Sequence, residues 1–106
     1  MTVFKLNQFG QTLTGREFGK SSYLEITKGA HALPIILDFS GVASLGSSFA
    51  DEVVPPLAQG QGGEITVLNA NDVVRSCLRD VRDETGIKII RGSLGVNAKI
   101  QEEGAI

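Results

Sequence analysis

The sequence predicts a single α/β domain built on a four-stranded, largely parallel sheet with helices packed on it. Four short apolar runs have the length and composition of strands, at residues 2–9, 35–39, 64–69 and 87–90. A helical segment separates each strand from the next. Strands that alternate with helices pair in parallel through right-handed crossovers, so this order favours a parallel sheet.

The length and composition indicate one folded domain and exclude some classes of partner. The chain has 106 residues, of which 42% are hydrophobic and 21% charged, which is typical of a globular domain with one core. Ten Lys and Arg residues against twelve Asp and Glu give a net charge of −2. Nucleic-acid binding depends on many basic contacts to phosphates, so we expect no nucleic-acid partner.

The rare residue types argue against a metal centre or a bound cofactor. Cys77 is the single cysteine and His31 the single histidine, so the sequence offers neither a disulfide nor a multi-histidine zinc site. Residues 1–10 lack the pattern of a signal peptide, and no apolar run approaches membrane-spanning length. We therefore expect a cytoplasmic protein with no cofactor and no membrane contact.

The first half of the chain predicts a strand and then a helix. Thr14 is the expected N-cap of a helix over about residues 15–28, and Glu17 completes a capping-box pattern. Gly10 and Gly15 have the spacing of a phosphate-binding loop. That loop requires a lysine followed by Ser or Thr, but Arg16 and Glu17 stand there, so we interpret the glycines as a strand-to-helix turn.

The second half predicts two more helices. The first covers residues 49–54, and Pro55 and Pro56 should kink it or divide it into two short helices. Asn71 is a strong N-cap for the second, over residues 72–84, and Gly86 ends it. Cys77 falls on the apolar face of that helix, where it should act as a small buried hydrophobe. We expect residues 1–91 to form the domain and residues 92–106 a loosely ordered tail.

The segment Asp38–Glu52, with the sequence DFSGVASLGSSFADE, is the candidate functional site. Asp38 ends a central parallel strand, and functional groups collect at the carboxyl ends of such strands. Ser47 or Ser48 should be the N-cap of the following helix, because a serine hydroxyl accepts well from backbone N–H groups there. A plain structural cap is one interpretation of this pattern.

Phosphorylation of one of these serines is the functional interpretation. A helix N-terminus receives a phosphate through its free N–H groups and dipole, and the phosphate adds about −1.5 to −2 charges. With Asp51 and Glu52 one turn away, the added charge would make a concentrated negative patch that repels a docked partner.

The same residues resemble a known family. Asp38-Phe39-Ser40, Val42 and the pair Ser47-Ser48 are similar to the strand and loop of STAS domains, the fold of bacterial anti-sigma factor antagonists. Gly46 and Phe49 stand where those antagonists carry an aspartate and a glycine. The resemblance is greater to a STAS-like family of unknown function, with a pattern GxTLxGREFG early, here residues 10–19, and DFxGVxSxxSSFADE later.

This resemblance implies a STAS-like domain that acts as a non-enzymatic regulatory protein-interaction module. It places the phosphoacceptor of the antagonists at Ser48, with Ser47 as the second candidate. The implied partner is a histidine-kinase-like ATPase acting as a serine kinase or an anti-sigma factor. The partner-binding loop would contain Asp38, Ser40, Gly46, Phe49, Asp51 and Glu52, with Phe49 either an exposed contact or a core plug.

Three other hypotheses remain open at this point. The domain could be a constitutive adaptor that needs no phosphorylation. It could sense a small anion or nucleotide through Gly46 and the serine N–H groups. A serine hydrolase is the third, although no general base is evident in the sequence.

Overall fold

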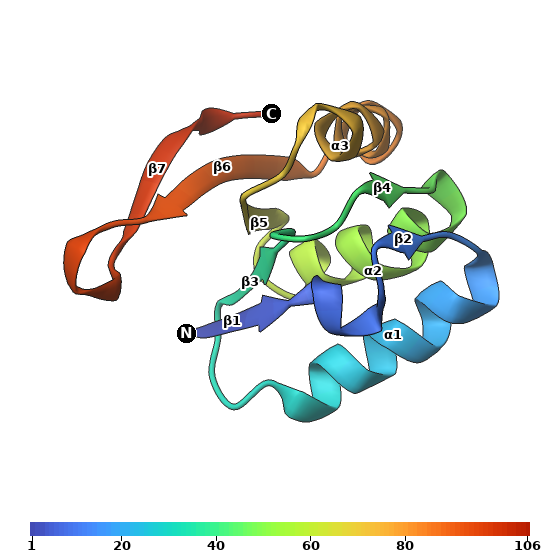
Figure 1. Cartoon of the computed structure of the whole chain (residues 1–106), viewed down its shortest axis with the longest axis horizontal. Coiled ribbons are helices and arrows are strands. Elements are labelled where there is room, and N and C mark those ends of the chain that lie inside the picture. The colour runs from blue at the N-terminus through green and yellow to red at the C-terminus, as the bar shows by residue number, and fades with distance from the viewer.

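The sheet of the domain has five strands and is mixed, not four-stranded and largely parallel as expected. The structure, a computed structural model, describes residues 1–106 except for the side chain of Ala98. The strand order is β1-β3-β5-β6-β7. The strands are β1 (Thr2–Lys5), β3 (Ile35–Asp38), β5 (Glu64–Leu68), β6 (Lys88–Leu94) and β7 (Ile100–Ala105). The first four pair in parallel, and β7 is antiparallel to β6 (Figure 1).

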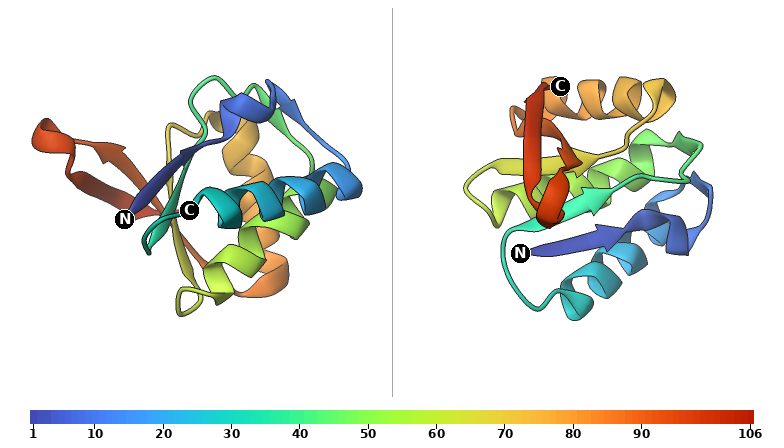
Figure 2. Two further views of the ribbon diagram at one scale, coloured as in Figure 1. Left: turned by 90° about the horizontal axis from the view of Figure 1, so that it is seen from below. Right: turned by 60° about the vertical axis from the view of Figure 1, so that its left-hand side comes forward.

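Three helices connect the parallel strands and lie on one face of the sheet (Figure 2, left). They are α1 (Arg16–Gly29), α2 (Ser47–Gln59) and α3 (Asp72–Thr85). Short 3-10 helices span Leu6–Phe9 and Val96–Ala98. The predicted first strand, residues 2–9, therefore ends at Lys5 and continues as a 3-10 turn. Among the residues that the structure describes, no helix has the length and apolarity needed to cross a bilayer.

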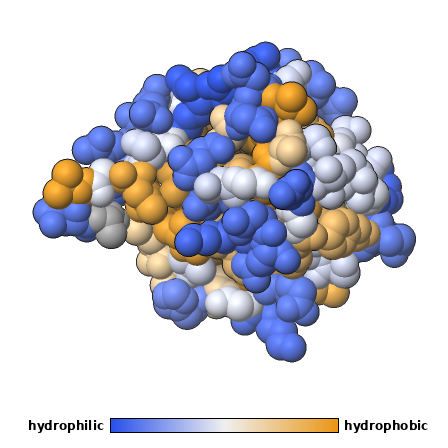
Figure 3. Space-filling view, in the orientation of Figure 1, coloured by the Kyte–Doolittle hydropathy of each residue, from blue (hydrophilic) through white to orange (hydrophobic). Residues whose placement is uncertain are grey.

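The C-terminal segment is a strand, and the expectation of a loosely ordered tail over residues 92–106 is wrong. Strand β6 runs on to Leu94, and β7 pairs back along it with a register shift between Arg91 and Gly92. This hairpin extends away from the helices (Figures 1 and 2). Two hydrophobic residues at its turn are open to solvent, with Leu94 49% and Val96 84% exposed, and hydrophobic surface is visible at this end in Figure 3.

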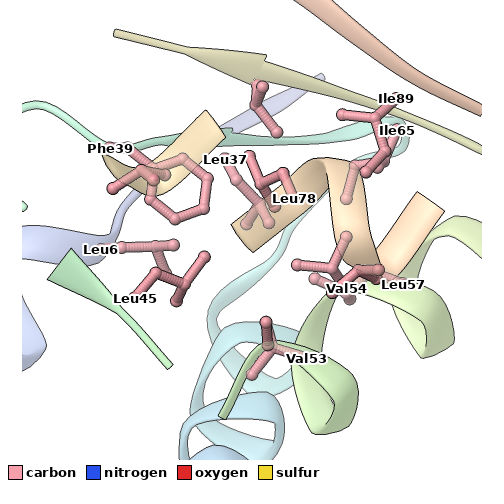
Figure 4. Packing of buried hydrophobic residues seen from close by; sticks show 14 of the residues in the cluster. Leu6, Leu37, Phe39, Leu45, Val53, Val54, Leu57, Ile65, Leu78 and Ile89 are labelled. Atoms are coloured by element: carbon pink, nitrogen blue, oxygen red, sulfur yellow. The ribbon is translucent and has the colours of Figure 1, made fainter. Parts of the chain in front are cut away.

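The hydrophobic core lies between the sheet and the helices (Figure 4). Because side chains alternate along a strand, every second residue faces the helices, and these are Ile35, Leu37, Ile65, Val67 and Ile89. Helix α2 contributes Val53, Val54 and Leu57, and α3 contributes Val74, Leu78 and Val81 at helical spacing. Leu6, Phe39 and Leu45 belong to the same cluster and close the end of the core where the strands finish (Figure 4).

The beginnings of α1 and α2 differ from the expected caps. Gly15, not Thr14, is the N-cap of α1, and no side chain caps it, so the capping box with Glu17 does not form. Helix α2 begins at Ser47 and continues through Pro55 and Pro56 as one helix instead of two. Its buried face, from Phe49 to Ala58, packs on both neighbouring helices and on β5. This packing outweighs the two hydrogen bonds that prolines cannot make.

Candidate functional site

Two segments far apart in the sequence, residues 10–19 and 38–52, meet at one end of the sheet. They form a second, two-stranded parallel sheet from β2 (Thr12–Leu13) and β4 (Ser44–Leu45). An ion pair of 2.6 Å between Arg16 Nη1 and Glu52 Oε1 joins the helices that follow these strands. The early block and the late block of the sequence pattern therefore build one structural unit.

The glycines of the early block serve the backbone of this unit. Gly10 and Gly15 have φ angles of +131° and +98°, which L side chains rarely adopt. Gly19 lies where α1 crosses α2, and a Cβ there would come within 2.8 Å of the Phe49 carbonyl oxygen. Turn geometry and close helix packing thus account for these glycines, in keeping with the strand-to-helix turn expected from the sequence.

Asp38 is a buried structural acceptor at the carboxyl end of β3. Its side chain is 5% exposed, and its Oδ1 accepts from the Ser40 amide at 2.9 Å and from Asn69 Nδ2 at 3.0 Å. The first bond closes an Asx turn that starts the loop to β4. The second ties that loop to the end of β5, where Asn69 has a φ of +58°. Ser40 itself is exposed.

Neither serine is the N-cap of α2, contrary to expectation. Gly46 occupies that position with an extended backbone, and no side-chain hydrogen bond caps the helix. The Gly46 amide donates to the Leu13 carbonyl at 2.8 Å, and a Cβ at this position would lie 3.0 Å from Thr14 Cγ2. This close approach to β2 favours glycine as the cap. Ser47 and Ser48 follow as the first two residues of α2.

Both serines are accessible, to different degrees. Ser47 is exposed and Ser48 is half-buried. The first-turn amides of an α-helix have no partner within the helix, and no side chain caps them here. Free N–H groups and the positive end of the helix dipole favour negative charge at this turn.

The other predicted loop residues divide between the core and the surface. Phe49 is completely buried, with its ring 5.2 Å from that of Phe18, so of the two roles considered it is the core plug. Asp51 is half-buried, and Glu52 holds Arg16. Phe49 is therefore removed from the set of residues that a partner could touch.

A groove of about 560 Å³ runs from the start of α2 along α3. Leu45, Val73 and Cys77 give it an apolar lining, and Val73 is 57% exposed. Ser47 stands in its wall, and the other lining residues are Asp72, Ser76 and Asp80. The sequence did not predict this groove, because the groove forms where α3 packs against β4, and these two elements are distant in the chain.

The groove has a negative electrostatic environment. Burial, together with Asp80, Asp51 and Glu84, raises the pKa of the Cys77 thiol from 9.0 to about 11. The thiol therefore stays protonated at neutral pH, and a protonated thiol is a poor nucleophile. Cys77 is half-buried rather than fully buried, and it acts as an apolar lining residue.

Comparison with known families matches residues 23–75 to the STAS-like domain of unknown function (DUF4325). The match spans half of the chain, from within α1 to the first turn of α3, and includes both serines. The chain belongs to this family. Searches of curated proteins and of solved structures gave no match.

Proposed function

We propose that this STAS-like domain is a non-enzymatic regulatory module that docks a protein partner at the start of α2, and that phosphorylation of a serine there controls docking. One observation carries the proposal: Ser47 and Ser48 lie in the uncapped first turn of α2, within reach of solvent, beside the buried Phe49 and Ala50 of the same helix. A partner can reach the hydroxyls without any rearrangement of the core.

The surroundings of the two serines favour an electrostatic switch. The apolar lining of the groove offers a partner contact area, and Ser47 stands at its wall. Asp51, Asp72 and Asp80 already make this region negative. A phosphate with about −1.5 to −2 charges would concentrate that charge at the mouth of the groove and repel a partner seated on the apolar lining.

The resemblance to anti-sigma factor antagonists supports one class of modifying enzyme. Their partners are histidine-kinase-like ATPases that act as serine kinases or anti-sigma factors, and we propose a partner of that class. Ser48 takes the place of the antagonist phosphoserine, while Ser47 is the more exposed of the pair. Both are therefore candidate phosphoacceptors.

The test uses purified histidine-kinase-like ATPases of the serine-kinase class, beginning with any whose gene lies beside the gene of this chain. Each ATPase is incubated with this chain and ATP, and mass spectrometry maps the modification. We expect a phosphate on Ser47 or Ser48, loss of it in the matching alanine variant, and weaker partner binding by Ser48→Asp. Ser21→Ala is the matched control, because Ser21 is an exposed helical serine on α1.

Two results would count against the proposal in different ways. Absence of phosphate on both serines, together with unchanged binding by Ser48→Asp, would exclude the switch. If partner binding nevertheless persists and does not respond to ATP, the domain is a constitutive adaptor. Loss of the modification in Ser21→Ala would place the phosphoacceptor outside the α2 turn.

A further inference from the structure

Three arginines gather between α3 and the β6–β7 hairpin, away from the serine-bearing turn. Arg75 and Arg79 are one helical turn apart on α3, and Arg91 comes from β6. Arg75 and Arg91 line a cavity of about 140 Å³ beside the carboxyl end of β5 and the middle of β6. Arg75 and Arg91, together with Arg79, also line a second hollow of about 350 Å³. The end of β7 approaches α3 at this place (Figure 1).

The positive charge of this cluster is incompletely balanced by the protein. Arg75 pairs with Asp72 through one terminal nitrogen, while its Nε is buried and has no hydrogen-bond partner among the described residues. Arg91 donates only to the Glu103 carbonyl, at a long 3.4 Å. Arg79 makes no ion pair within the part of the chain that the structure describes. A buried donor without an acceptor is costly, so a ligand that supplies one is favoured.

The strand register and a register shift in β6 place Arg91 beside the cavity. Arg91 is opposite Val67 in the register, and so lies on the face of the sheet that carries the helices. The register shift between Arg91 and Gly92 lies beside the cavity, and such bulges re-aim a side chain. Ser93, the loop residues Asn69 and Ala70, and the acidic residue Glu103 also line the cavity.

We propose that the cavity between α3 and the β6–β7 hairpin binds the phosphoryl group of a small anionic ligand. Guanidinium groups match the oxygen geometry of phosphate and form charge-assisted hydrogen bonds to it. Three arginines against Glu103 and the paired Asp72 leave net positive charge in a chain whose total is −2. A phosphoryl group carries charge of the opposite sign, and a cavity of about 140 Å³ has room for it. This ligand site is independent of serine phosphorylation.

The experiment titrates inorganic phosphate and, separately, AMP into the full chain while NMR follows the amide signals. We expect saturable shifts centred on Ala70 and Ser93. Arg91→Gln should weaken phosphate binding by about tenfold or more, since hydrogen bonds to charged groups are strong. Glu103→Gln should tighten it, because that change removes a negative charge from a lining residue. Arg82→Gln, also on α3 but paired with Asp83, is the matched control and should bind as the unaltered chain does.

The two ligands separate the possible sources of the phosphoryl group. Equal affinities for inorganic phosphate and AMP mean that the site recognises the phosphoryl group alone. A higher affinity for AMP means that its nucleoside part adds contacts. The proposal is overturned if neither ligand shifts Ala70 or Ser93, or if Arg91→Gln and Arg82→Gln weaken binding equally. If an arginine variant fails to fold, Glu103→Gln still tests the proposal, because this variant keeps all three arginines and should bind phosphate more tightly.

Discussion

At the scale of single residues, Asn71 joins three parts of the molecule through one amide side chain. Its Oδ1 accepts from the Val74 amide at 2.8 Å and so caps α3. Its Nδ2 donates to the carbonyl oxygens of Val42 and Ala43, each at 3.2 Å. The sequence predicted the cap from residue type and spacing. The two donated bonds fix the loop that leads to the serines.

We predict that Asn71→Ala destabilises the domain and that Ser47→Ala does not. Loss of the cap costs about 0.5–2 kcal/mol, and loss of the bonds to the loop adds about 1 kcal/mol. Ser47 caps nothing, so its replacement should change the free energy of unfolding by less than about 0.5 kcal/mol. Urea unfolding of the two variants measures both values. A comparable loss for Ser47→Ala would show that the Ser47 hydroxyl caps α2 after all.

At the scale of elements, the close crossing of α1 and α2 sets the position of the serine-bearing turn. Gly19 permits this approach, because its missing side chain leaves room for the backbone of α2 at Phe49. The aromatic rings of Phe18 and Phe49 pack beside the crossing, and Arg16 and Glu52 pair across it. The beginnings of both helices are thereby held together.

We predict that Gly19→Ala destabilises the domain by about 1–3 kcal/mol, because the new methyl group would overlap the Phe49 backbone and force the helices apart. Gly29→Ala in the same helix is the matched control. A Cβ there would meet only an atom of Phe4, at 3.8 Å, so this change should be neutral or stabilising by up to about 1 kcal/mol. Thermal unfolding compares the two variants, and equal effects would contradict a role for the crossing.

The elements whose signals are local were predictable from the sequence. Helix α3 has an N-cap at Asn71, apolar residues at helical spacing and a left-handed Gly86 at its end, and the structure confirms all three. The central strands β3 and β5 were also expected, since Ile35–Leu37 is a continuous apolar run and Glu64–Leu68 is rich in β-branched residues. The family was predicted from the block that includes Ser47 and Ser48, and the comparison confirms it.

The elements that depend on distant contacts were not predictable. Strand β7 has the sequence IQEEGA, which lacks apolar alternation, and its pairing with β6 defines it. Strands β2 and β4 have two residues each, and they are strands only because they pair with each other. The cap at Gly46 depends on the closeness of Thr14, which no local pattern encodes. The arginine cluster likewise forms only when α3, β6 and β7 assemble.

At the scale of the whole molecule, stability is distributed unevenly across the sheet. Strands β3 and β5 are paired on both sides and mostly buried, whereas β7 is an edge strand with almost every residue exposed. The turn end of the hairpin extends beyond the helices (Figures 1 and 2), and a two-stranded extension of this kind is marginal by itself. The hairpin that lines the arginine cavity is therefore the least protected part of the sheet.

We predict that amide hydrogen exchange is slowest in β3 and β5 and much faster in β7, since opening free energy follows burial and pairing. Exchange measured residue by residue by NMR at neutral pH tests this order. Protection in β7 equal to that in β5 would contradict it. Such a result would mean that the hairpin opens only together with the core.

The outer edge of β7 has one further consequence, for the behaviour of concentrated solutions. An edge strand leaves a row of unpaired amides and carbonyls that invites sheets of neighbouring molecules to join. Here that edge carries the adjacent exposed carboxylates Glu102 and Glu103 and a glycine at position 104 with a φ of +118°. Two copies meeting edge to edge would bring like charges together over an irregular backbone, so the sheet is protected against fibrous growth at its most accessible border.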